Sequence, residues 1–126
     1  MNVQSSFNEK RKNPRLDSNV PVKIIHADGD IVTETANISR SGVYCQVDKN
    51  IEPMTKLKIN LLLPVKRSGK NTSKKISCEG VVVRTEPIVG KNRYHVAIFF
   101  NDISPKDSEI IADYIVSLLE QEREAN

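Results

Sequence analysis

Residues 36–47 read ANISRSGVYCQV, and the second half of this stretch has the period of a β-strand. Val43, Cys45 and Val47 point to one side of an extended chain, and the residues between them point to the other. The first half is rich in Asn, Ser and Gly, which favour turns. The stretch therefore predicts a polar turn that leads into a half-buried strand of an antiparallel sheet.

Five further strands are expected on either side of this stretch, because β-branched and apolar runs recur there. They cover residues 21–26, 31–38, 57–63, 75–85 and 93–100. Asp28-Gly29 predicts a tight hairpin between the first two of these, and Pro64 is expected to end the strand over 57–63. Gly80 predicts a bend or a close backbone approach. Six short strands at fairly even spacing predict an antiparallel sheet that curls on itself.

The pattern changes to a helical period after these strands. Ser104 is the expected N-cap, and Pro105 takes the first helical position. The apolar residues that follow share one helical face: Ile110, Ile111, Tyr114, Ile115, Leu118 and Leu119. We expect this helix to bury its apolar face against the open end of a β-barrel.

The chain has 126 residues, which suits one domain with one core. We expect a mainly β fold with a mobile N-terminal arm over 1–19, a six-stranded barrel over 20–104 and a C-terminal helix over 105–126. The net charge is +3. Two basic and six acidic residues lie in the predicted helix, so the rest of the chain carries +7. A basic body predicts an anionic partner.

Cysteine usage and the lack of known catalytic motifs narrow the class of protein. Cys45 and Cys78 form no CxxC pair, which favours two buried thiols in a reducing compartment. The sequence shows neither a membrane-spanning apolar run nor an apolar N-terminal leader, so a cytoplasmic location without membrane insertion is expected. His26 and His95 lack partners at metal-ligand spacing. Neither GxxxxGK[ST] nor GxSxG occurs, so we expect no enzyme and no cofactor.

Four cations lie within six residues of the N-terminal arm: Lys10, Arg11, Lys12 and Arg15. Arginine presents a planar fork of donors that can hold a phosphate or the O6/N7 edge of guanine, and it can stack on a base. Two arginines four residues apart could clasp one nucleotide. The alternative is a solvated basic arm.

The polar stretch at 37–42 carries a second group of candidate residues. Asn37 offers an amide with one acceptor oxygen, and Ser39 offers a hydroxyl on the same face of an extended chain. Gly42 is free to adopt a positive φ in a tight turn. The alternative is an ordinary polar hairpin loop.

The two groups together resemble the PilZ domain, a bacterial receptor for cyclic di-GMP. Residues 11–15 fit RxxxR, and residues 37–42 fit [D/N]xSxxG. The resemblance extends over about residues 9–119, because residues 80–84 look like the family's late G-x-V-V-R strand and a C-terminal helix follows. It implies a six-stranded antiparallel barrel with a C-terminal capping helix, as the strand pattern predicts independently.

The resemblance also implies roles for single residues. Arg11 and Arg15 would contact guanine edges and phosphates, while Asn37 and Ser39 would hydrogen-bond the ligand. Gly42 would permit a close backbone approach. The family commonly has Asp at the position of Asn37, and Asn supplies fewer acceptors.

Three cations extend the expected ligand site. Lys10 and Lys12 would match the charge of a ligand that the family often binds as a stacked pair. Arg40 is either a further phosphate contact or a solvated loop residue. We expect a non-enzymatic receptor whose arm changes conformation on ligand binding and which signals through an effector protein.

Three alternatives remain open at this point. The domain could be a PilZ-like protein-interaction module that does not bind the nucleotide. It could also be a barrel that binds single-stranded nucleic acid, although Phe99 is the one evident candidate for stacking bases. The basic loop over 64–75 is either a solvated hairpin tip or a docking patch for an acidic partner or nucleic acid.

Overall fold

The computed structural model describes residues 16–67 and 69–125 of the chain. Seven strands precede one helix in these ranges. They are β1 (Leu16–Asp17), β2 (Pro21–Ile25), β3 (Ile31–Ser39), β4 (Gly42–Val47), β5 (Lys56–Arg67), β6 (Lys70–Pro87), β7 (Tyr94–Asp102) and α2 (Pro105–Ala125). Residues 1–15 of the arm that was predicted over 1–19 lie outside the described residues. Its last four residues form β1 and the link from β1 to β2, which the sequence did not indicate.

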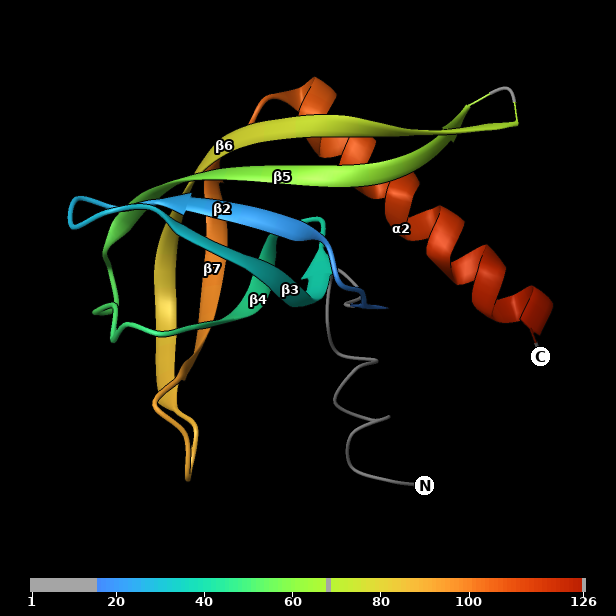
Figure 1. Ribbon diagram of the computed structural model, residues 1–126. Coiled ribbons are helices and arrows are strands. Elements are labelled where there is room, and N and C mark those ends of the chain that lie inside the picture. The colour runs from blue at the N-terminus through green and yellow to red at the C-terminus, as the bar shows by residue number, and fades with distance from the viewer. Residues whose placement is uncertain (1–15, 68, 126) are drawn as a thin grey trace.

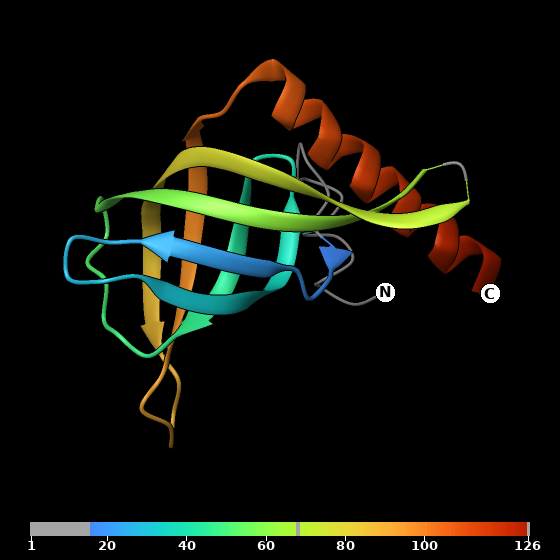
Figure 2. The ribbon, with the colours of Figure 1, turned by 45° about the horizontal axis from the view of Figure 1, so that its top comes forward.

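Six of the strands form a ring-like antiparallel sheet (Figures 1 and 2). The order is β3-β2-β5-β6-β7-β4, and pairing of β4 with β3 closes the ring. The two-residue strand β1 adds to β3. The predicted six-stranded antiparallel fold with a C-terminal helix is therefore confirmed.

The inner face of the ring carries the core, as the alternation of apolar residues predicts. Val43, Cys45 and Val47 of β4 are buried. Each other long strand contributes a similar set, including Ile24, Ile38, Ile59, Leu61, Ile76, Val82 and Ile98. The alternating burial of β2, β4 and the middle of β6 follows directly from the two-residue period of an extended chain.

Helix α2 starts at the predicted cap and closes the ring with one face. The Asp107 amide donates to the Ser104 hydroxyl over 3.1 Å. Ile111, Tyr114 and Ile115 are buried in the core, whereas Leu119, the last residue of the predicted stripe, is exposed. Its exposure fits the geometry of the helix, which runs on past the ring (Figure 1). No helix within the described residues is long and apolar enough to cross a membrane.

The β5–β6 hairpin is longer than the sequence predicts. Strand β5 continues through Pro64 to Arg67, so the expected stop at Pro64 is wrong. Pairing with β2 extends only to Leu61, and beyond that point β5 has β6 as its one neighbour in the sheet. A proline is tolerated where one edge of a strand needs no partner. The resulting two-stranded ribbon extends beyond the ring on the side of α2, as both ribbon views show.

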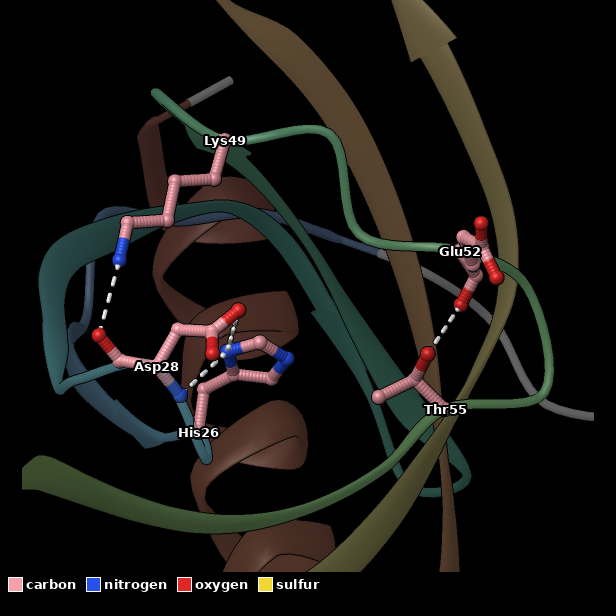
Figure 3. A network of polar contacts seen from close by, with 5 residues as sticks. All are labelled: His26, Asp28, Lys49, Glu52 and Thr55. Carbon is pink, nitrogen blue, oxygen red and sulfur yellow. Dashed lines mark hydrogen bonds and ion pairs between the residues drawn. The ribbon is translucent and has the colours of Figure 1, made fainter.

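The predicted Asp28-Gly29 turn joins β2 and β3. Gly29 has φ of 127°, a value that side chains disfavour, and its amide donates to the carbonyl of His26 over 3.0 Å. The Asp28 amide donates to Nδ1 of His26, and Lys49 Nζ donates to the Asp28 carbonyl (Figure 3). His26 thus stabilises the turn by accepting both of these amide hydrogen bonds. No group of three or more residues that could hold a metal ion occurs in the described parts of the chain.

Two glycines allow neighbouring strands and side chains to approach closely. A Cβ at Gly80 would lie 2.7 Å from methyl groups of both Ile59 and Ile98, so the predicted close approach at Gly80 is confirmed. A Cβ at Gly42 would overlap the carbonyl oxygen of Ile98, which belongs to the backbone of β7. Gly42 does not have a positive φ. The predicted role of this glycine in a strained turn is therefore wrong, and its lack of a side chain serves the β4–β7 approach instead.

We predict that Gly42→Ala lowers the free energy of unfolding more than Gly80→Ala does. Gly80→Ala should cost about 1–3 kcal/mol, as is usual for overpacking, because the ends of two isoleucine side chains can turn aside. The carbonyl that faces Gly42 cannot move without shifting β7. Urea denaturation would measure both variants, with Ser73→Ala at an exposed position of β6 as the control. An equal or reversed order would contradict this account.

The two cysteines are buried free thiols, as predicted. Burial raises the pKa of Cys45 from 9.0 to about 12. Burial, together with the nearby carboxylates of Asp107 and Asp102, raises the pKa of Cys78 to about 11. The thiolate, which is the reactive form, is therefore suppressed at both positions.

We predict that a disulfide reagent modifies neither cysteine of the folded protein at mildly alkaline pH and modifies both in strong denaturant. Because the folded thiols keep their protons where unfolded thiols lose them, stability should fall as pH rises through 9.0 toward about 11. A Cys45→Ser, Cys78→Ser variant should lack this alkaline decline. Rapid labelling of the native protein would refute the buried-thiol description.

Candidate functional site

The β3–β4 hairpin carries the motif residues Asn37, Ser39 and Gly42. Ser39 pairs with Gly42 across a two-residue turn, Arg40-Ser41. The Ser41 amide donates to the Ser39 hydroxyl over 3.2 Å, and the two serine hydroxyl oxygens lie 3.1 Å apart. The turn is also held to β7, because the Phe100 amide donates to the Ser41 carbonyl over 2.9 Å. The hydroxyl of Ser39, which is buried, thus stabilises the turn that carries it.

Asn37 lies just after an irregularity in β3. The register with β4 shifts between Thr35 and Asn37, and Ile38 then enters the core. Asn37 and Ser39 flank Ile38 and so share the opposite, outer face, as the two-residue period predicts. The Asn37 side-chain oxygen Oδ1 is buried and has no hydrogen-bond partner among the described residues. A buried acceptor without a donor is unfavourable by about 1–3 kcal/mol, so a donor brought to this oxygen would be stabilising.

Strand β1 brings the start of the chain to the same place. Leu16 is opposite Ile38 in the sheet, and Asp17 is opposite Asn37. Arg15, the second arginine of RxxxR, immediately precedes β1 in the sequence. The other predicted cations of this motif are Lys10, Arg11 and Lys12, and all four lie outside the described residues. The described register therefore anchors the root of the arm beside Asn37.

Thr35 holds this root in place, and sequence reasoning missed it. Its hydroxyl donates to the Ser18 carbonyl and accepts the Val20 amide at 3.0 Å. Its own amide donates to the Val20 carbonyl over 2.9 Å. Thr35 is 1% exposed, and the bond from the Val20 amide is buried, whereas the bond to the Ser18 carbonyl is partly buried. A threonine within a β-branched run gives no sequence signal for such a role, because it also fits an ordinary strand.

Helix α2 contacts both segments that carry the motifs. Arg40 of the hairpin turn donates from Nε to the Ser108 hydroxyl over 3.2 Å, and its terminal nitrogen lies 3.7 Å from a Glu109 carboxylate oxygen. The Ser18 hydroxyl hydrogen-bonds the Tyr114 hydroxyl. Arg40, predicted as either a phosphate contact or a solvated residue, is half-exposed and pairs with α2.

An aromatic and charged cluster borders the motif on the outer face. Tyr44 is opposite Asn37 in the β3–β4 pair, and its ring stacks on His95 with 5.2 Å between ring centroids. The Arg84 guanidinium lies 5.9 Å from the centre of the Tyr44 ring, and Arg84 also pairs with Glu86 at 3.0 Å. The cluster places a further arginine near Asn37, which the motif alone did not reveal.

The chain was compared with known families, curated proteins and solved structures. The family model of the PilZ domain matches residues 9–117. A comparison with curated proteins gives no match.

Three solved structures have a similar fold. The first is the motility inhibitor MotI/DgrA of Bacillus subtilis, with a TM-score of 0.79, 20% identity, 90% of this chain covered and 53% of that chain. The second is the PilZ domain of YcgR from Escherichia coli with c-di-GMP, with a TM-score of 0.66, 15% identity and coverages of 92% and 96%. The third is YcgR in complex with c-di-GMP, also from Escherichia coli, with a TM-score of 0.71, 12% identity and coverages of 92% and 49%.

These similarities agree with the architecture described above. The chain spans about half the length of MotI and of the longer YcgR structure. At these identities the solved structures establish the fold alone, whereas the family model covers most of the chain, including both motifs. The chain therefore belongs to the PilZ domain family.

Proposed function

We propose that this protein is a receptor for cyclic di-GMP and that the ligand binds on the outer face of β3 and β4. One observation carries the proposal: the β1–β3 register, with Asp17 opposite Asn37, places the two residues that directly follow RxxxR in the sequence beside the start of [D/N]xSxxG. Residues far apart in the sequence thus meet at one place. The structures of YcgR with c-di-GMP, which have the same fold, support this choice of ligand.

The chemistry of Asn37 supports a guanine ligand. Its buried Oδ1 has no partner among the described residues, and guanine offers donors at its ring N–H and exocyclic amine. The family commonly has a carboxylate at this position. Asn37 has one amide oxygen instead, so a single acceptor would bind the guanine donors. Because the site is partly dry, a hydrogen bond at this oxygen should be stronger than at an exposed one.

The cations of the arm would supply the phosphate contacts. We propose that Arg11 and Arg15 contact guanine edges and phosphates, with Lys10 and Lys12 adding charge that matches a stacked pair of ligands. Ser39 and Gly42 would act mainly by shaping the hairpin, since the Ser39 hydroxyl already bonds within the turn. Arg40 could reach a phosphate only by leaving its partners on α2.

The same contacts suggest how binding would be transmitted. Ser18, at the root of the arm, and Arg40, in the hairpin, are both bonded to α2. A ligand that draws the arm over the β3–β4 face would therefore bias the contacts of α2 as well. We propose that an effector protein recognises the altered arm and helix, and that no catalysis is involved. We place the receptor in the cytoplasm, since both cysteines are free thiols.

We predict that calorimetric titration detects cyclic di-GMP binding and that Arg11→Ala and Arg15→Ala each weaken it by about 1.5–3 kcal/mol, the range for a charge-assisted hydrogen bond. Arg→Lys should restore little, because the planar fork is lost. Asn37→Leu should also weaken binding, because the acceptor oxygen is removed. Lys58→Ala, at an exposed position of β5 that pairs with β2, is the charge-matched control.

Two outcomes would contradict this proposal. Absence of heat and of a thermal shift at high ligand concentration would exclude the receptor function and favour the interaction module. Equal losses in Lys58→Ala and Arg15→Ala would mean that the arm acts only through its net charge.

We predict that saturating cyclic di-GMP increases the protection of residues 8–18 from amide hydrogen exchange, while the strands of the core change little. The reason is that bound ligand would fix the arm against the β3–β4 face. Peptides of the β5–β6 ribbon serve as the internal control. Unchanged protection of residues 8–18, in a sample shown calorimetrically to be saturated, would refute the proposed arm movement while leaving binding intact.

A further inference from the structure

The outer face of the sheet continues beyond the motif onto β7. Ser39 is opposite Gly42 in the β3–β4 pair, Gly42 is opposite Phe99 in the β4–β7 pair, and Phe99 is opposite Val81 in the β6–β7 pair. Neighbouring strands lie about 4.8 Å apart, so Phe99 is about 10 Å from Ser39 along this row. The row is continuous, because each member is the direct partner of the next.

Phe99 is the exposed aromatic side chain of the described residues. Phe99 is 47% exposed, whereas Phe100 and Tyr114 are buried in the core and Tyr94 packs against the core. The Tyr44 ring is covered on the outer face by His95 and Arg84. Among the aromatic side chains of residues 16–67 and 69–125, Phe99 is therefore the most accessible to a ligand.

Three of the residues that neighbour Phe99 on the outer face are small, and the fourth, Asn101, is exposed. Gly42 and Val81 lie across from Phe99 in the sheet, and Ala97 lies two residues before it on the same face of β7. None of them can cover an aromatic ring, and Gly42 cannot gain a side chain without overlapping β7. The requirement for glycine at this position therefore also keeps the surface between Ser39 and Phe99 free of a side chain.

We infer that Phe99 is a stacking platform for a purine base of the bound ligand. This inference rests on the proposed function and adds a second contact to it, on a strand that neither motif includes. If one guanine binds at Asn37, the second base of the same ligand would reach Phe99. In a stacked pair of ligands, a base of the second ligand would do so. Stacking on an aromatic side chain is worth about 1–3 kcal/mol per base, which is comparable to each arginine contact.

An exposed phenylalanine is not in itself evidence of a site, since single apolar side chains are common on protein surfaces. The position of Phe99 carries the argument, and the chain offers a control that separates position from exposure. Val32 is 77% exposed on β3 and is opposite Lys23 of β2, away from the row that starts at Ser39. Truncation there removes exposed apolar surface without touching the proposed platform.

The test is calorimetric titration of cyclic di-GMP into the wild type, Phe99→Ala, Phe99→Leu, Phe99→Tyr and Val32→Ala. Phe99→Ala should weaken binding by about 5- to 150-fold. Phe99→Tyr should bind as the wild type does, because the ring is kept. Phe99→Leu should stay weak, because leucine keeps apolar area but lacks a π face. Val32→Ala should leave binding unchanged.

The outcomes separate this inference from the function on which it rests. If the wild type binds and Phe99→Ala binds equally well, the platform is excluded while the receptor function remains. If Phe99→Leu matches the wild type, stacking is excluded in favour of simple apolar burial. If the wild type itself does not bind, the proposed function fails, and the platform fails with it. Melting temperatures without ligand should be similar for all variants, and a large drop in Phe99→Tyr and Phe99→Ala alike would overturn the assignment by making Phe99 a structural residue.

Discussion

The hydrogen bonds of Thr35 join β3 to the segment between β1 and β2, and the position of the candidate site depends on this connection. Its hydroxyl and its amide together hold Ser18 and Val20 against β3. The strand β3 pairs with β2 and β1 along one edge and with β4 along the other, so it both closes the ring and receives the start of the chain. Losing the Thr35 hydroxyl would leave the buried Val20 amide without a partner, and such a group is unfavourable by about 1–3 kcal/mol. Thr35 therefore fixes the position of Ser18 and Val20, and it also lies directly before the shift in the β3–β4 register.

The three residues of the second motif divide into two physical roles. Ser39 and Gly42 build the hairpin: the hydroxyl bonds within the turn, and the missing side chain lets β4 approach the β7 backbone. Asn37 has no such structural role, because its buried oxygen has no hydrogen-bond partner among the described residues. A short sequence motif can thus combine residues that shape a surface with a residue that would bind on it.

Helix α2 contacts both Ser18, which follows β1, and Arg40 in the β3–β4 turn. Its buried face completes the core, while Tyr114 and Ser108 bond to the arm root and to the hairpin. The Arg40–Glu109 pair is largely exposed, and such pairs contribute less than about 1 kcal/mol. A phosphate could therefore compete for Arg40 at small cost. The link to α2 is weak enough to be changed by a ligand, whereas the core contacts of Ile111 and Ile115 are not.

Local patterns in the sequence determined which residues form strands and the helix, because the two-residue and helical periods are properties of the chain itself. They also identified the Asp28-Gly29 turn, the cap at Ser104 and the residues of both motifs. The two-residue strand β1, the continuation of β5 through Pro64 and the role of Gly42 were decided by tertiary structure alone. Each depends on a neighbour from a distant part of the chain: β3 for β1, the end of β2 for Pro64, and the Ile98 carbonyl for Gly42. The same holds for the row from Ser39 to Phe99, since strand register sets which side chains are adjacent, and register is a relation between segments that no single segment contains.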